Sequence, residues 1–190
     1  MREFLDRAQA ATGEGGRLPL GAMPGWEVFP WEAEGLRARP LTDYAVPEPD
    51  RSADPGSCKT CQVLADPDRV LGTIGDFVVI WVPTSLVFTA NVATREHLRL
   101  EDLDPASYAG MGQALGAAYS AVRALDGVGN VHVNKWENGK GHCSFVLNAR
   151  PEGVLQLRGS NLPAWADMLP PTRLEELRER AEQVRAALAG

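Results

Sequence analysis

Two pairs of apolar segments, rich in β-branched and aromatic side chains, occur in the chain, and each pair is typical of a strand hairpin. The first pair is "DFVVIWVP" (76–83) and "LVFTANVAT" (86–94), separated by Thr84 and Ser85. The second pair is "NVHVNKW" (130–136) and "HCSFVLNAR" (142–150), joined by the glycine-containing turn "ENGKG". Two hairpins of this kind predict an antiparallel sheet.

Apolar residues spaced three and four apart predict two helices, one between the hairpins and one at the C-terminus. The first begins with Asp104 as N-cap and Pro105 in the first helical position. In the second, Thr172 and Glu175 match a capping box. The apolar faces comprise Tyr108, Met111, Leu115, Ala118, Val122 and Leu125, and then Leu174, Leu177, Ala181, Val184 and Leu188. This order of elements predicts an α+β domain whose sheet packs against a central helix and a C-terminal helix.

The first part of the chain differs from the rest in composition. It is rich in proline, glycine and charged residues and contains an aromatic cluster of Trp26, Phe29 and Trp31. The stretch "VPEPDRSADPG" (46–56) is the most linker-like part of the sequence. We therefore expect an N-terminal arm over residues 1–55, a core over 56–170 and a C-terminal helix over 171–190.

The charge and hydropathy of the chain argue against several classes of partner. The net charge of the 190 residues is -6, so there is no basic signal for nucleic acid or for an acidic membrane surface. The sequence contains no long apolar run that predicts a membrane-spanning helix, and the first residues contain no apolar segment of a secretory signal. We expect a cytoplasmic protein with neither a nucleic-acid nor a membrane partner.

Cysteines and histidines supply the candidate metal chemistry. The three cysteines are an odd number, which argues against a disulfide framework, and Cys58 and Cys61 form a CxxC pair that favours metal binding or redox chemistry. His97 follows the second strand of the first hairpin, and His142 begins the last strand. Together with the CxxC pair they would form a Cys2His2 zinc site if these ends meet in space. The alternative is a pair of thiols without a metal and two histidines with structural roles.

The segments "CKTCQVLADPD", "GDFVVIWVP", "VATREHLRLEDLDPASYAGMGQAL" and "NVHVNKWENGKGHCSFVLNARPEG" carry a family resemblance. Over about residues 56–153 the layout resembles the histidine-triad (HIT) superfamily, including its galactose-1-phosphate uridylyltransferase branch. Many members bind structural zinc, and the resemblance implies Cys58, Cys61, His97 and His142 as the ligands here. Because HIT-like domains often dimerise through the sheet and a helix, the resemblance also implies a homodimer.

The HIT resemblance also shows what this chain lacks. The superfamily's last strand carries H-x-H-x-H, whose middle histidine attacks the α-phosphorus of a nucleotide. The corresponding residues here are His142, Ser144 and Val146. A serine needs an adjacent base to act as a nucleophile, Val146 cannot be that base, and His132 on the neighbouring strand is the remaining candidate. The chemistry of the superfamily is therefore expected to be lost or much reduced.

Polar residues around the second hairpin are candidates for holding a ligand. Asn134 and Lys135 lie where the superfamily places residues that contact the ligand, and Lys140 in the glycine-rich turn can meet an anion. The first hypothesis is a zinc-binding HIT-like protein that binds a nucleotide or another small anion without cleaving it. The alternatives are a divergent HIT-family hydrolase or nucleotidyltransferase, an enzyme with different chemistry in the same pocket using Ser144 and His132, or a zinc-dependent interaction module.

Overall fold

A computed structural model describes residues 9–26, 29–31, 34–36, 54–136 and 141–190. The chain divides into two compact units, residues 1–49 and 50–190, which are described separately. In the first unit, two short 3-10 helices span Glu14–Gly16 and Met23–Gly25. The rings of Phe29 and Trp31 pack edge to face with their centroids 5.4 Å apart.

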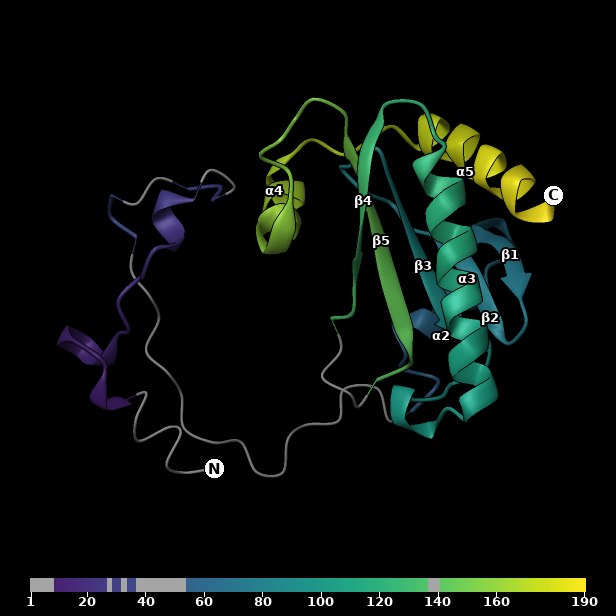
Figure 1. Ribbon diagram of the computed structural model, residues 1–190, viewed down its shortest axis with the longest axis horizontal. Coiled ribbons are helices and arrows are strands. Elements are labelled where there is room, and N and C mark those ends of the chain that lie inside the picture. The colour runs from purple at the N-terminus through teal and green to yellow at the C-terminus, as the bar shows by residue number, and fades with distance from the viewer. Residues whose placement is uncertain (1–8, 27–28, 32–33, 37–53, 137–140) are drawn as a thin grey trace. The chain divides into compact units, whose positions relative to one another are not determined.

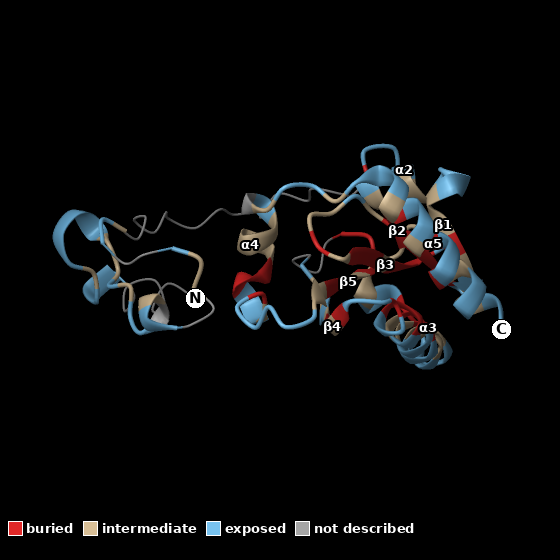
Figure 2. Ribbon diagram, turned by 90° about the horizontal axis from the view of Figure 1, so that it is seen from above, coloured by how far each residue is buried: buried red, intermediate tan, exposed pale blue. Residues whose placement is uncertain are grey.

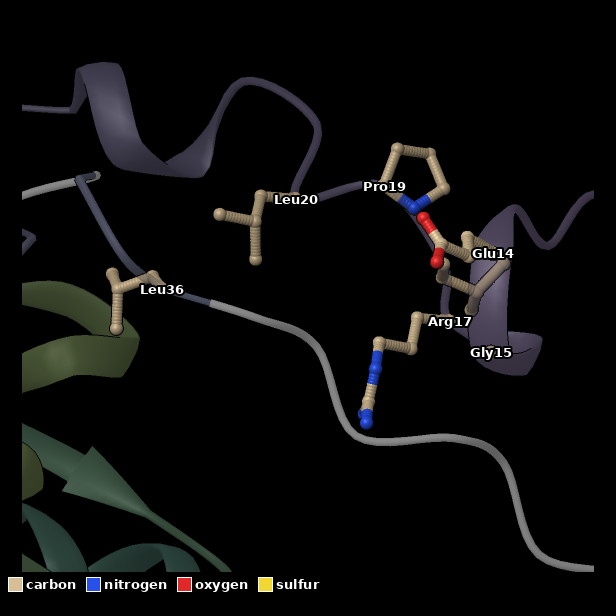
Figure 3. Close-up of a pocket in the computed structure, with 7 residues that line it drawn as sticks. Glu14, Gly15, Arg17, Pro19, Leu20 and Leu36 are labelled. Carbon is tan, nitrogen blue, oxygen red and sulfur yellow. The ribbon is translucent and has the colours of Figure 1, made fainter.

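The first unit contains a cavity of about 520 Å³ (Figure 3). The residues that line it are Glu14, Gly15, Arg17, Leu18, Pro19, Leu20 and Leu36. None of these is among the side chains that the sequence predicts to carry chemistry. All the residues that the sequence predicts to carry chemistry belong to the second unit, residues 50–190.

The second unit is built on a five-stranded, fully antiparallel sheet in the order β1-β2-β3-β5-β4 (Figure 1). The strands are β1 (Val70–Ile74), β2 (Phe77–Trp81), β3 (Phe88–Thr94), β4 (Val128–Asn134) and β5 (Ser144–Pro151). The helices are α2 (Lys59–Leu64), α3 (Pro105–Arg123), α4 (Leu162–Met168) and α5 (Leu174–Ala189). Short 3-10 helices span Pro67–Arg69, Leu100–Asp102 and Gly159–Asn161. The α+β class predicted from the sequence, with a sheet, a central helix and a C-terminal helix, is confirmed.

Helix α3 begins at the predicted residue because its first turn is capped. The carboxylate of Asp104 accepts a hydrogen bond of 2.7 Å from the backbone N–H of Ser107, and Pro105 occupies the first turn. The predicted capping box at the start of α5 is wrong. The hydroxyl of Thr172 instead donates a 2.7 Å hydrogen bond to the carbonyl oxygen of Leu86, and no side chain caps this helix.

The main core lies between the sheet and the two long helices, α3 and α5. Figure 2 shows the red, buried positions concentrated in the centre of the sheet, with α2 and α3 on opposite faces of it. The side chains at its centre are Phe77, Val79, Phe88, Val92, Ala118, Val122, Leu147, Leu177 and Val184. Cys143 and Phe145 also belong to this face, as the alternation along the last strand predicts.

The opposite face of β3, β4 and β5 is polar. One row across the three strands consists of Thr89, Asn148 and His132, with Asn148 of β5 paired to the other two. The next row consists of Asn91, Val146 and Asn134, with Val146 of β5 in the middle. Arg150 follows Asn148 by two residues and therefore points to the same side. We call the six residues Thr89, Asn91, His132, Asn134, Asn148 and Arg150 the polar sheet face. None of the described helices has the length and apolar character needed to cross a lipid bilayer.

Candidate metal centre

Four residues distant in sequence come together at one end of the sheet. One ligand atom each from Cys58, Cys61, His97 and His142 lies within 4.8 Å of all the others. The two thiols come from the start of α2, where residues three apart lie on the same side of a helix. The two histidines come from the end of β3 and from the segment just before β5.

The sheet register explains why the two histidines meet although they are separated by a helix and a strand in the sequence. Strands β3 and β5 are antiparallel neighbours, and Ala93 near the end of β3 pairs with Ser144 at the start of β5. His97 follows β3 by three residues, and His142 precedes β5 by two. Their rings therefore lie at the same end of the sheet, with centroids 5.1 Å apart.

The distances within the cluster fit a four-coordinate metal ion. The Nδ1 atom of His97 lies 3.2 Å from the Sγ of Cys61, and the Nδ1 atom of His142 lies 3.3 Å from the same sulfur and 3.7 Å from the Sγ of Cys58. A tetrahedral zinc ion with ordinary bond lengths would hold sulfur and nitrogen ligands about 3.6 Å apart. The donor set, two thiolates and two imidazoles, is also the one that structural zinc sites use.

A backbone contact orients one of these ligands. The Nε2 atom of His142 lies 2.8 Å from the carbonyl oxygen of Thr94, which can only accept a hydrogen bond. Nε2 therefore carries the proton and Nδ1 presents its lone pair to the two sulfurs. Such contacts behind a histidine ligand fix its tautomer and its ring orientation.

The protonation of the thiols depends on whether a cation is bound between them. Burial, together with the hydrogen bond and the charge of neighbouring Cys58, raises the pKa of Cys61 to about 11. Without a cation the Cys61 thiol therefore keeps its proton at neutral pH. A divalent cation stabilises the thiolate, and its binding releases the proton. The arrangement is chemically suited to a metal ion and unsuited to two free thiolates.

The structure separates the two residues predicted as a nucleophile and its base. His132 pairs with Asn148, four residues along β5 from Ser144, a distance of about 13 Å along the strand. Ser144 pairs instead with Ala93, and its exposed fraction is only 4%. The structure therefore does not bring Ser144 and His132 together.

His132 lies in surroundings that keep its ring neutral. Burial, followed by the positive charge of Arg150, lowers the pKa of His132. The Nε2 atom of His132 is shielded from solvent and has no hydrogen-bond partner among the described residues. A neutral imidazole with one nitrogen unused is a group that a ligand can bind.

The residues predicted to bind a ligand lie at the end of β4. Asn134 is the last residue of the strand and is half-buried on the polar sheet face, where its Nδ2 lies 3.4 Å from the carbonyl oxygen of His132. Lys135 follows directly and is also half-buried. Lys140 lies outside the described residues.

Sequence reasoning missed several residues of this region. The contact of Thr94 with His142 is made by a backbone carbonyl, which no side-chain motif reveals. Asn91 and Asn148 were missed as well, although polar residues inside otherwise apolar strands are a signal that can be read from the sequence. An amide in such a strand marks a face that is not part of the main core.

Comparison with protein-family models and with curated proteins finds no match to this chain. Similar solved structures include a Hit-like protein involved in cell-cycle regulation from Bartonella henselae, with 19% identity over 67% of this chain and 93% of that chain and a TM-score of 0.49. A Zn-bound histidine triad family protein from Mycobacterium smegmatis has 21% identity over 72% of this chain and 96% of that chain, also with a TM-score of 0.49.

A uridylyltransferase mutant is similar at 20% identity and a TM-score of 0.49, over 70% of this chain but only 48% of its own. This chain thus spans about half the length of that uridylyltransferase. Two of these similar structures are a Hit-like and a histidine triad family protein, and the superfamily that the sequence resembles has the same name. At these identities and this TM-score the likeness says nothing about activity, which has to be inferred from the site's own residues.

Proposed function

We propose that this chain is a zinc-binding HIT-like protein that binds a nucleotide or another small anion and does not transfer nucleotidyl groups. The convergence of Cys58, Cys61, His97 and His142 within 4.8 Å carries the proposal. Zinc is the metal that this donor set favours, because thiolate and imidazole ligands in a tetrahedron match its preferences.

The proposed zinc is structural. Four protein ligands complete a tetrahedron and leave no open position for water or substrate, whereas catalytic zinc sites use three protein ligands. The ion would tie the start of α2 to the end of β3 and to the segment just before β5, three parts of the chain that are distant in sequence. Its contribution would therefore be to the free energy of folding.

The nucleotidyl chemistry of the superfamily would be absent for two reasons. Positions 144 and 146 carry serine and valine, so the histidine nucleophile is missing. Ser144 is also buried and lies four residues along the strand from the register partner of His132, so His132, the candidate base, is not placed to activate it. The register gives no support to the alternative of an enzyme that uses Ser144 and His132.

Metal analysis of the untagged, as-purified protein tests the zinc site. We expect about one zinc ion per chain in the wild type, less than a tenth of that in His142→Ala, and a wild-type content in His132→Ala. His132 is the matched control because it is the remaining histidine of the chain and lies outside the cluster. Equal zinc contents in all three proteins, or none in the wild type, would reject the site.

An activity measurement tests the second half of the proposal. The protein would be incubated with a nucleoside phosphoramidate and with a dinucleoside polyphosphate, and release of the nucleoside monophosphate would be followed by chromatography. We expect no turnover above the rate without protein. Turnover that disappears in Ser144→Ala would show that the serine has replaced the histidine nucleophile, and the binding-only function would then be wrong.

A further inference from the structure

A cavity of about 310 Å³ lies at the end of the sheet where β2 begins and β3 ends. Three parts of the chain build it: the start of β2, the segment that ends and follows β3, and the approach to α3 with its first turn. The residues that line it are Asp76, Phe77, Thr94, Arg95, Glu96, Leu98, Leu103 and Ser107. Neither the candidate metal ligands nor the residues of the polar sheet face are among them, so this cavity is separate from both.

The walls of the cavity include three apolar side chains. Phe77 lies directly opposite Thr94 in the register of β2 and β3, so both side chains are on the same face of the sheet. Phe77 and Leu103 are buried in the main core, and Leu98 is half-buried against it. A volume at the lower end of the range for small-molecule sites, with apolar walls, suits a compact organic ligand.

The two hydroxyl groups of the cavity have already used their protons. The hydroxyl of Thr94 donates to the carbonyl oxygen of Cys143, and the hydroxyl of Ser107 hydrogen-bonds the carboxylate of Asp104, which only accepts. Because each hydroxyl has a single proton, both oxygens are left to a ligand as acceptors.

Two carboxylates, Asp76 and Glu96, also offer only acceptors. Both side chains are exposed, and neither forms an ion pair or a hydrogen bond with the described residues. The neighbouring guanidinium of Arg95 donates instead to the carbonyl oxygen of Gly75 at 3.1 Å. Two carboxylates against one guanidinium leave the lining with an excess of negative charge.

We propose that this cavity binds a small primary amine, with its apolar body against Phe77, Leu98 and Leu103 and its ammonium group beside the two carboxylates. An ammonium group has three donors and no acceptor, so it complements a site whose free side-chain groups accept. A metal ion fits less well, because the apolar walls offer it no ligand and, among the described residues, no third metal-ligating side chain joins these carboxylates. The inference goes beyond the proposed function, since it uses a different cavity and a ligand of opposite charge.

Isothermal titration calorimetry of the full-length, metal-loaded protein with phenethylamine at neutral pH tests the site. We expect saturable binding of about one amine per chain, with a Kd on the order of 1 mM. Phenethyl alcohol keeps the ring and loses the charge, whereas ethylamine keeps the ammonium group and loses the ring. Each should therefore bind at least about fivefold more weakly than phenethylamine.

The double variant Asp76→Asn, Glu96→Gln removes both negative charges and keeps the shape of each side chain. Because both residues are exposed and have no partner in the described part of the chain, the ligand-free Tm should stay near the wild-type value. The Kd for phenethylamine should rise at least about fivefold. The control Glu101→Gln, Glu179→Gln makes the same change in net charge at exposed positions outside the cavity and should leave the Kd unchanged.

Three results would overturn the inference: no saturable binding of phenethylamine, equally tight binding of ethylamine or phenethyl alcohol, or an equal Kd in the Asp76 and Glu96 variant and in the control. The first two concern the wild type alone, so the test does not depend on how the variants fold. Zinc content measured on the same samples tests the proposed function separately. Normal zinc without amine binding rejects only this inference, whereas missing zinc rejects the metal site.

Discussion

The imidazole of His142 is held by the backbone of a different strand: its Nε2 atom lies 2.8 Å from the carbonyl oxygen of Thr94. The same ring presents Nδ1 to the sulfur of Cys61 at 3.3 Å. Since Thr94 ends β3 and His142 precedes β5, the contact ties the register of two neighbouring strands to the orientation of one candidate metal ligand. A metal bound here would therefore stabilise the strand pair as well as the cluster.

Removal of the metal is expected to lower the stability of the second unit strongly. At a free zinc concentration about 1,000 times the Kd, binding contributes about 4 kcal/mol, which corresponds to a Tm difference on the order of 10 °C for a chain of this size. Thermal unfolding with and without a chelator would measure it. Restoring zinc should restore the Tm, and adding magnesium should not, because magnesium prefers oxygen ligands.

His142→Asn is the matched variant for the chelator experiment. It should already have a low Tm, and the chelator should lower it by less than about 2 °C, because one ligand and its contact with Thr94 are lost. A wild-type Tm that does not respond to the chelator would contradict a structural metal, even if the four side chains lie close together.

Protonation of His132 is expected to destabilise the fold. Its pKa lies below the ordinary value of 6.5, because of burial and then of Arg150, so the unfolded chain binds this proton more readily than the folded chain. The stability that neutral His132 contributes is fully present above about pH 6.5 and is lost as the pH falls through that value toward the lower folded pKa. The free energy of unfolding should therefore fall on acidification.

Denaturant unfolding of the wild type and His132→Gln, at pH steps from about 7.5 to about 5, isolates this effect. We expect the wild type to lose more stability than the variant over this range, because glutamine does not titrate. Taking the difference between the two proteins removes the contributions of other groups, including the metal cluster. If the free energy of unfolding falls by the same amount with pH in both proteins, the fold does not disfavour the charged form of His132.

The sequence predicted the hairpins and the central helix from local patterns of apolar residues, and the four residues of the cluster from the CxxC pair and the family resemblance. Strands β2 and β3 were visible as β-branched runs, and α3 was visible through Asp104, Pro105 and its apolar spacing. Strand β1 and the short helices α2 and α4 were missed. β1 contains a central glycine, and the two helices are six and seven residues long, too short for a clear period.

Register was the information that the sequence could not supply. Alternation correctly placed Asn134 and His132 on one face, but it does not say which residue of β5 lies opposite which residue of β4. The placement of His132 opposite Asn148 separated it from Ser144 and put it in a row with Thr89. The polar sheet face is therefore a product of strand pairing, and no single motif encodes it.

The cap of α3 gives a prediction about folding that does not depend on the metal. The carboxylate of Asp104 accepts a hydrogen bond of 2.7 Å from the backbone N–H of Ser107. Hydrogen bonds from the backbone and the side chain of Ser107 lower the pKa of Asp104. Asp104→Ala should lower the Tm by about 2–4 °C, while Asp104→Ser should retain most of the wild-type Tm because serine also caps helices.

Acid should remove the advantage of the carboxylate. The depressed pKa means that the stability from ionised Asp104 is present above its ordinary pKa of 3.8 and is lost as the pH falls through the lower folded value. Denaturant unfolding of the wild type and Asp104→Ala at neutral pH and near pH 3 would measure this. We expect the difference in free energy of unfolding between the two proteins to be smaller near pH 3 than at neutral pH. A difference that is the same at both pH values would assign the effect to helix propensity at this position, and no difference at either pH would show that the cap does not stabilise α3.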